Sequence, residues 1–255
     1  MSSLACVSPA PRLSRPLSQR PHSLGCRTRE REGAEKAAAA PGRRYTFPPS
    51  CLQPPPLPPS LQPDPLDAVD LQAWYMDDDT VTDQRAPHIK EGAPPVTPAT
   101  LRALGVLAWK VPPAIPAGAA RLAAIRKARG YSYQDTIEVS PAKLPGYDQK
   151  IKSFYEEHVH TDEEIRYVLA GSGYFDVRGA GDEWIRILVR EGDLIVLPEG
   201  IYHRFTLDTA NHIVVNRLFV GEPVWTAHNR PQEEGAARES RARYVAAFLG
   251  GSVAV

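Results

Sequence analysis

The feature that most constrains the fold is a switch to a two-residue hydrophobic period. From residue 164 to residue 220, apolar and polar residues alternate in six short runs, as in β-strands with one buried face. Glycine, aspartate and proline separate the runs at close intervals, so the sequence predicts an antiparallel barrel or sandwich. The predicted strands are Glu164–Leu169, Gly173–Arg178, Trp184–Arg190, Asp193–Leu197, His203–Leu207 and Ile213–Val220.

Helical patterns flank this β-rich segment. Thr97-Pro98 is typical of a helix start and Gly130 of a helix end, because threonine caps the first turn and glycine accepts a positive φ. Helices are predicted at Thr97–Gly105, Ala119–Arg129, Tyr147–Tyr155 and Ala236–Leu249, and a further short strand at Ala73–Met76.

Residues 1–70 differ in composition from the rest of the chain. They hold 14 of the 26 prolines and all three cysteines, so residues 71–255 can form neither a disulfide nor a thiolate metal site. We expect one folded domain at 71–255, preceded by a disordered extension at 1–70, because this composition buries too little apolar surface to offset the entropy of ordering. Five arginines and several serines precede the first acidic residue, Glu30, which is typical of a plastid or mitochondrial transit peptide. A plain disordered tail and an overextended gene model are the alternatives.

Charge and motif content exclude several function classes. Thirty basic residues balance 30 acidic ones, so no bulk electrostatic attraction to nucleic acid or to a membrane surface is expected. No run reaches the roughly 18 apolar residues of a membrane-spanning helix. The sequence also contains no glycine-rich phosphate loop and no nucleophile elbow.

The segment FYEEHVHTDEEIRY contains the candidate metal ligands His158, His160 and Glu164. In extended backbone their even spacing places all three on one face. A fourth candidate, His203, begins the return strand of a predicted hairpin, 39 residues after Glu164. Closing a barrel can bring that strand beside the first. The alternative is that each histidine is an unrelated core or surface residue.

Three imidazoles and one carboxylate suit a borderline divalent ion such as Fe(II) or Ni(II). On an octahedral metal they would leave two adjacent positions open for a bidentate oxygen substrate. A structural zinc site would more often be tetrahedral and cysteine-rich. The other histidines are weaker candidates: His22 lies in the extension, and His88, His212 and His228 are predicted to face solvent.

These residues resemble the two motifs of the cupin superfamily. The stretch His158-x-His160-x3-Glu164-x6-Gly171 is similar to the first motif, although Lys152 replaces its leading glycine. The stretch Gly192-x5-Pro198-x-Gly200-x2-His203 is similar to the second, with Leu207 in place of its asparagine. Over residues 71–249 the resemblance narrows to acireductone dioxygenase, on AWYMDD (73–78), KLPGYDQKIKSFYEEHVHTDEEIRYVLAGSGYFDVR (143–178), LPEGIYHRFTLD (197–208) and RLFVGEPVWTAHNRP (217–231).

The resemblance implies a mainly β fold, the cupin double-stranded β-helix barrel with short flanking helices. It implies one Fe²⁺ or Ni²⁺ per monomer, and 1,2-dihydroxy-5-(methylthio)pent-1-en-3-one and O2 as substrates in methionine salvage. With Fe the products would be formate and 4-methylthio-2-oxobutanoate. With Ni they would be formate, CO and 3-(methylthio)propanoate. It also favours a monomer in cytoplasm and nucleus, whereas a transit peptide would direct the chain to a plastid or mitochondrion.

Three further residues are candidates for the substrate site. Arg166 follows Glu164 by two and should share its interior face, where an arginine is costly unless it meets an anion. The resemblance implies that Arg166 and Arg217 contact substrate oxygens and that Trp225 lies near the substrate. Surface or salt-bridge arginines and a core tryptophan are the alternatives. The alternative is that the chain is a metal-free or differently specific cupin that acts as a binding or scaffold protein.

Overall fold

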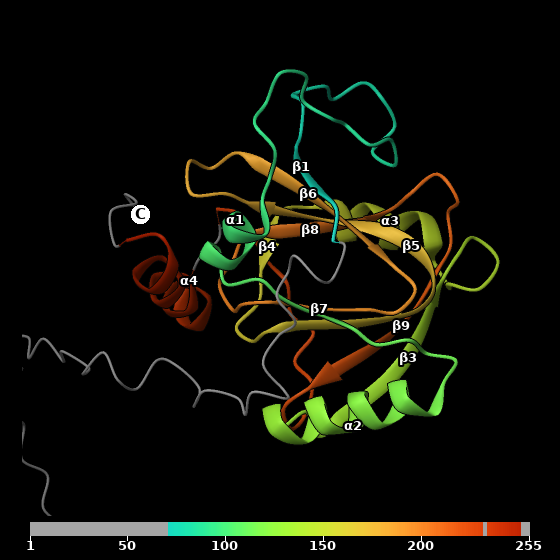
Figure 1. Cartoon of the computed structure of the whole chain (residues 1–255). Coiled ribbons are helices and arrows are strands. Elements are labelled where there is room, and N and C mark those ends of the chain that lie inside the picture. The colour runs from blue at the N-terminus through green and yellow to red at the C-terminus, as the bar shows by residue number, and fades with distance from the viewer. Residues whose placement is uncertain (1–70, 232–233, 251–255) are drawn as a thin grey trace, which may run out of the picture. The chain divides into compact units, whose positions relative to one another are not determined.

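A computed structural model of the chain describes residues 71–231 and 234–250. The predicted extension at 1–70 lies outside the described residues, so its transit-peptide, tail and gene-model interpretations all stay predictions. Within the described part, the expected mainly β barrel is present, with four helices around it (Figure 1).

Two antiparallel sheets face each other and share one strand, β5 (Glu164–Arg178). Sheet 1 contains, in spatial order, β1 (Ala73–Tyr75), β6 (Trp184–Arg190), β5, β8 (His203–Leu207), β4 (His158–Val159) and β10 (His228–Asn229). Sheet 2 contains β2 (Leu107–Lys110), β7 (Asp193–Leu197), β5, β9 (Ile213–Phe219) and β3 (Tyr133–Val139). Of these strands, β2, β3, β4 and β10 were not predicted from the sequence.

The predicted strands Glu164–Leu169 and Gly173–Arg178 are one continuous strand, so the predicted break between them is wrong. The pairing of β5 with β9 shifts register between Val168 and Ala170, and such a bulge bends a strand without ending it. Gly171 has a φ of +74°, and a Cβ there would lie 2.2 Å from the carbonyl oxygen of His212. Glycine therefore permits the close approach at the bend that carries β5 from sheet 2 into sheet 1.

The predicted hairpin in which His203 begins the return strand is also wrong. β7 pairs with β2 and β5, whereas β8 pairs with β5 and β4, so the two strands lie in opposite sheets. The bend between them contains Gly200, whose φ is +74°. Its backbone N–H donates to the carbonyl of His160 at 3.0 Å. The turn that was expected to close a hairpin instead crosses the barrel beside the candidate ligands.

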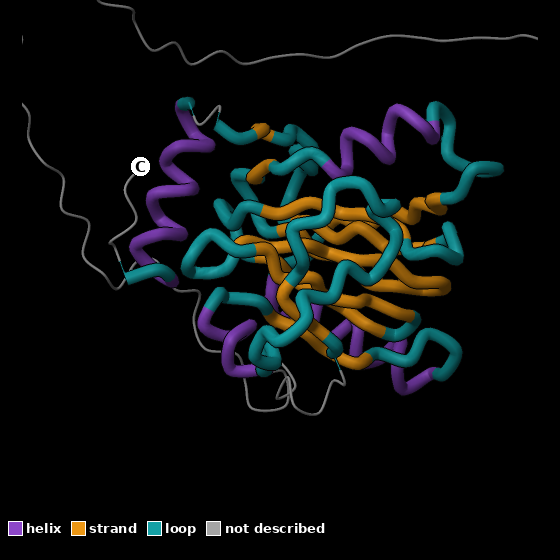
Figure 2. The backbone as a smooth tube through the Cα atoms, turned by 90° about the horizontal axis from the view of Figure 1, so that it is seen from above, coloured by secondary structure: helices purple, strands orange, loops and turns teal. Residues whose placement is uncertain are grey.

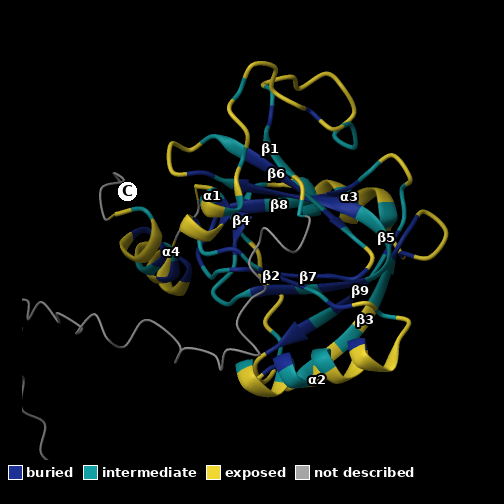
Figure 3. Cartoon of the chain, viewed as in Figure 1, coloured by how far each residue is buried: buried dark blue, intermediate teal, exposed yellow. Residues whose placement is uncertain are grey.

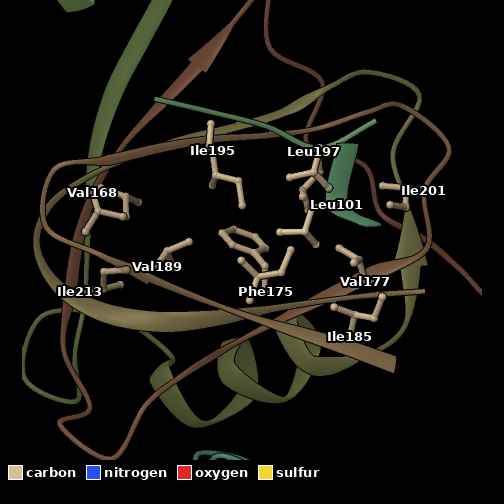
Figure 4. Packing of buried hydrophobic residues seen from close by; sticks show 14 of the residues in the cluster. Leu101, Val168, Phe175, Val177, Ile185, Val189, Ile195, Leu197, Ile201 and Ile213 are labelled. Atoms are coloured by element: carbon tan, nitrogen blue, oxygen red, sulfur yellow. The ribbon is translucent and has the colours of Figure 1, made fainter. Parts of the chain in front are cut away.

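The main core lies between the two sheets. Phe175 and Val177 of β5 and Ile185 of β6 pack against Ile195 and Leu197 of β7, as the inward-pointing side chains in Figure 4 illustrate. The opposite face of sheet 2 packs on helix α2 (Pro116–Arg129) through a second cluster. The cluster contains Trp109, Ile125, Ile165, Tyr167, Leu194 and Leu218, with Leu122 against it. Figure 3 shows the strands buried while the outer side of α2 is exposed.

The helices follow the predictions closely. α1 (Pro98–Ala103) begins with the predicted Thr97 cap, which forms a reciprocal capping box with Thr100. α2 begins three residues before the predicted Ala119, α3 (Tyr147–Tyr155) has its predicted bounds, and α4 (Gly235–Phe248) is displaced by one residue.

The segment between β1 and α1 crosses the outside of sheet 1, where Figure 2 shows it in front of the strands. Among the described residues, no helix combines the length and apolar character needed to cross a membrane.

Candidate metal centre

The four predicted ligands come together inside one end of the barrel. His158 lies in β4 directly opposite His203 of β8, so antiparallel pairing across 45 residues brings two imidazoles side by side. His160 follows β4 in a turn, and Glu164 begins β5. The extended backbone expected from His158 to Glu164 is thus two strands, β4 and β5, joined by a short turn. One ligand nitrogen from each histidine lies within 4.8 Å of the others.

Backbone carbonyls fix the tautomer of all three histidines. Nδ1 of His158 donates to the carbonyl of Glu156 at 2.6 Å, Nδ1 of His160 to that of Thr226 at 2.7 Å, and Nδ1 of His203 to that of Ile201 at 3.0 Å. A carbonyl oxygen only accepts, so each Nδ1 carries a proton, and the neutral form of each imidazole then has its lone pair on Nε2. This is the arrangement in which an imidazole binds a metal.

Glu164 adds a carboxylate to this nitrogen cluster. Its Oε2 lies 3.2 Å from Nε2 of His160 and 3.6 Å from Nε2 of His203. Burial alone raises the pKa of Glu164, but Arg166 and the two imidazoles hold that pKa well below its usual range. Burial, followed by the neighbouring imidazoles of His203 and His160, lowers the pKa of His158 to about 3. The site therefore combines an ionised carboxylate with an imidazole held neutral.

The residues present fit a divalent cation. Nε2 of His203 is buried and lacks a hydrogen-bond partner within the described part of the chain, and such an orphaned group is costly unless something binds it. Convergent nitrogen lone pairs and one carboxylate are a donor set for a borderline transition metal. With one carboxylate and three neutral imidazoles, a divalent ion would leave a net charge of +1, which favours an anionic substrate.

The two predicted substrate arginines lie beside this cluster. Arg166 and Arg217 stand directly opposite each other on β5 and β9, and Nη2 of Arg166 is 3.2 Å from Oε2 of Glu164. Together with Glu164 they line a cavity of about 90 Å³. Its remaining walls are apolar: Ile137, Val139, Phe154, Phe175, Phe205, Ile213 and Val215. The cavity thus has a cationic end beside the candidate ligands and a hydrophobic body.

Trp225 lies at the outer side of the two arginines. The Arg217 guanidinium carbon is 4.0 Å from the centre of the Trp225 ring, and that of Arg166 is 5.8 Å away. The tryptophan is 38% exposed and contacts Tyr133 and Phe219 edge-on. The core alternative therefore does not hold: Trp225 stacks on an arginine at the edge of the site.

The four acidic residues that flank the ligands accept hydrogen bonds from side chains other than the imidazoles. Glu157 accepts from Arg178 and Arg230, and Glu163 accepts from Arg129 and Tyr131. Glu156 accepts from Asn229, and Asp162 accepts from Thr161. Backbone carbonyls orient the imidazoles instead.

The prediction that His88 faces solvent is wrong. It is 6% exposed, and its Nδ1 lies 2.9 Å from Oδ1 of Asp77 while its Nε2 lies 3.0 Å from the carbonyl of Asp83. His88 thus connects Asp77 and Asp83 within the segment between β1 and α1, and it is not one of the candidate ligands. The imidazole of His212 is 42% exposed, as expected.

Sequence reasoning missed Asp135, Phe154 and Phe205. The two phenylalanines line the cavity, and Asp135 forms an ion pair with Arg217. A signal for Asp135 existed, because Tyr133, Asp135, Ile137 and Val139 alternate with period two. Because Asp135 is itself polar and its neighbours Gln134 and Thr136 are also polar, β3 was not predicted.

Comparisons with known proteins place these residues in a family context. Residues 72–227 match the model of the ARD/ARD′ family. Acireductone dioxygenase from Branchiostoma floridae is 59% identical over 169 residues, which cover 66% of this chain and 94% of that protein. Acireductone dioxygenase 1 from Oryza sativa subsp. japonica is 56% identical, over 66% of this chain and 84% of the relative. A solved structure of acireductone dioxygenase from Bacillus anthracis, with cadmium ion in the active center, is 29% identical over 51% of this chain and 86% of that one, with a TM-score of 0.46.

Proposed function

The chain belongs to the ARD/ARD′ family of acireductone dioxygenases, and from this premise we propose its substrate, its metal and its products. The substrate is 1,2-dihydroxy-5-(methylthio)pent-1-en-3-one, cleaved with O2 in methionine salvage. The observation that carries the proposal is the convergence of one ring nitrogen from each of three histidines next to the Glu164 carboxylate, which lines one cavity together with two arginines.

We propose that His158, His160, His203 and Glu164 hold one Fe(II) or Ni(II) ion. Bound there, the ion would supply Lewis-acid stabilisation of the substrate anion. The protein's own contribution begins with the carbonyls of Glu156, Thr226 and Ile201, which keep each imidazole in the tautomer that binds. Burial of the site keeps competing water away from it.

Arg166 and Arg217 bind and orient the enediolate. The substrate is an electron-rich enediol that binds best as an anion, and two guanidiniums offer charge-assisted hydrogen bonds to its oxygens. Arg166 suits this role because its charge is buried, and a buried guanidinium is costly unless it faces an anion. The apolar wall that includes Phe154 and Phe205 suits the methylthio end of the substrate. Trp225 keeps Arg217 stacked at the edge of the site.

Metal content separates this proposal from a metal-free cupin that binds or scaffolds. We expect purified full-length protein to carry one equivalent of Fe or Ni, and His158→Ala to lose it while keeping its circular dichroism spectrum. Full metal occupancy in variants of His158, His160 or Glu164 would contradict the ligand assignment.

A turnover assay distinguishes the proposed function from that of a cupin that acts on another anion. Anaerobic Fe(II)-loaded protein mixed with acireductone should react only when O2 is admitted, giving formate and 4-methylthio-2-oxobutanoate in equal amounts. The Ni(II)-loaded protein should give formate, CO and 3-(methylthio)propanoate. Absence of formate with both metals would refute the dioxygenase assignment.

We further propose that the protein is a monomer in cytoplasm and nucleus, with a plastid or mitochondrion as the alternative if residues 1–70 act as a transit peptide. Imaging the full chain against a version that begins at Leu71 with an added methionine tests this. Organelle signal that requires residues 1–70 would establish the alternative. Size-exclusion chromatography with light scattering measures the oligomeric state.

A further inference from the structure

Three charged side chains form a row across the interior face of sheet 2. Asp135 on β3 stands directly opposite Arg217 on β9, which stands directly opposite Arg166 on β5. Directly opposite residues of antiparallel strands project from the same face. Glu164 lies two residues before Arg166 on that face and contacts it. The two guanidiniums therefore lie between two carboxylates, of which Glu164 belongs to the candidate metal centre and Asp135 has no assigned role.

Asp135 holds Arg217 by both oxygens. Nε of Arg217 donates to Oδ1 of Asp135 at 2.8 Å, and Nη2 donates to Oδ2. A bidentate pair of this kind fixes the plane of the guanidinium as well as its position. Tyr133 donates its hydroxyl to Oδ2 of Asp135 at 3.1 Å and also packs against Trp225. The carboxylate is thus itself held in place.

The Arg217 guanidinium contacts an aromatic ring and a carboxylate, and it also lines the cavity. The Trp225 ring covers one face of the guanidinium at 4.0 Å, while the Asp135 pair uses Nε and Nη2. The nitrogen that the pair does not use is Nη1, and Arg217 lines the same cavity as Arg166 and Glu164. Hydrogen bonds from Arg217 lower the pKa of Asp135, so the carboxylate stays ionised at neutral pH.

We propose that Asp135 is a positioning residue for substrate binding: it locks Arg217 against Trp225 so that the guanidinium meets the substrate anion in one preformed orientation. This inference rests on the proposed function, because it assigns Asp135 a role only through the contact of Arg217 with the enediolate. An arginine freed from its carboxylate regains rotamers that binding must then remove, and misplacement of a binding group by about 1 Å can cost a hundredfold in rate.

Charge alone predicts the opposite result, which makes the proposal testable. Removing the Asp135 carboxylate raises the local positive charge, so a purely electrostatic role would strengthen binding of the anion. Positioning predicts weaker binding. Asp135→Asn suits the test because it keeps the size of the side chain while replacing one of the two carboxylate oxygens with an N–H donor. Asp135→Glu keeps both carboxylate oxygens on a side chain that is one methylene longer, so it should recover part of the lost substrate binding.

The experiment uses Fe(II)-loaded full-length protein with acireductone. It measures kcat/KM, the anaerobic Kd for acireductone, metal content and Tm for the wild type, D135N, D135E, R217A and the double variant D135N/R217A. The matched control is Glu138→Gln, which removes a carboxylate from the other face of the same strand, where it pairs with His212.

We expect D135N to lower kcat/KM by about ten- to a hundredfold, to raise the Kd, and to leave metal content unchanged. In the R217A background the same substitution should change kcat/KM by less than about twofold, because contacting residues are not additive. The E138Q control should keep kcat/KM within about twofold of the wild-type value.

Unchanged or tighter binding in D135N would overturn the positioning role, as would a loss of equal size with and without Arg217. Wild-type protein that fails to turn over acireductone with either metal would instead refute the proposed function, and the positioning role with it.

Discussion

Replacing Asp176 with asparagine is expected to destabilise the barrel more than any exposed charge substitution. Asp176 and Arg186 are both 0% exposed. The guanidinium donates to the carboxylate at 2.7 and 2.8 Å, and Arg204 donates to it at 2.9 Å. The three residues lie in register across β6, β5 and β8. Asp176 therefore joins the strands of sheet 1 next to His203.

The magnitude follows from what the substitution leaves behind. The Arg186 charge stays buried without its counter-ion, and breaking such a pair from one side costs about 3–5 kcal/mol. Two carbonyls, those of Gln84 and Ala86, also accept from Arg186 at 3.0 and 2.5 Å, so the lower end of that range is the better expectation. At roughly 2–4 °C per kcal/mol for a domain of 150–250 residues, Tm should fall by about 6–12 °C.

The assay is urea unfolding of the full-length chain with chelator present, because a bound metal would add its own stabilisation. Circular dichroism and tryptophan fluorescence should give coincident transitions with an unchanged m-value. The matched control is Asp182→Asn, since the Asp182 side chain is 52% exposed in its pair with Arg230. The control should change the unfolding free energy by about 1 kcal/mol or less.

A loss below about 1 kcal/mol in D176N would refute the reasoning, because it would mean that Arg186 is satisfied without its carboxylate. A loss as large in D182N would point to a general effect of net charge and contradict the burial argument.

Three further outcomes are expected. Gly200→Ala should destabilise the protein more than Gly221→Ala: both glycines have a φ of +74°, but only at Gly200 would a Cβ meet a backbone oxygen, that of Ser240 at 2.4 Å; equal losses of unfolding free energy in urea would refute the close-contact argument. Trp225→Ala should lower kcat/KM by about two- to fivefold, the scale of an exposed cation–π contact with Arg217, while Tm changes little; wild-type kinetics would show that the stacking is not used. Chelation of the purified protein should lower both metal content and Tm, and restoring Fe(II) should recover both; a Tm independent of metal would contradict a site formed by the folded state.

Local sequence patterns determined much of this protein. The two-residue period predicted the barrel strands, and cap residues predicted α1 and the end of α2. The spacing of His158, His160 and Glu164, with His203 further along, predicted a cluster that the fold brings together. The same period placed Arg166 on the interior face with Glu164. These features are short-range, since strand alternation and helix caps depend on residues only a few positions apart.

Only the tertiary structure decided which distant residues meet. Asp135 and Arg217 are 82 residues apart, and nothing within YQDTIEV indicates that its carboxylate faces an arginine on β9. Likewise, β7 and β8 follow each other in sequence like a hairpin but lie in opposite sheets. Buried partners of this kind follow from strand pairing and register, which the whole barrel fixes by burying one face of every strand together.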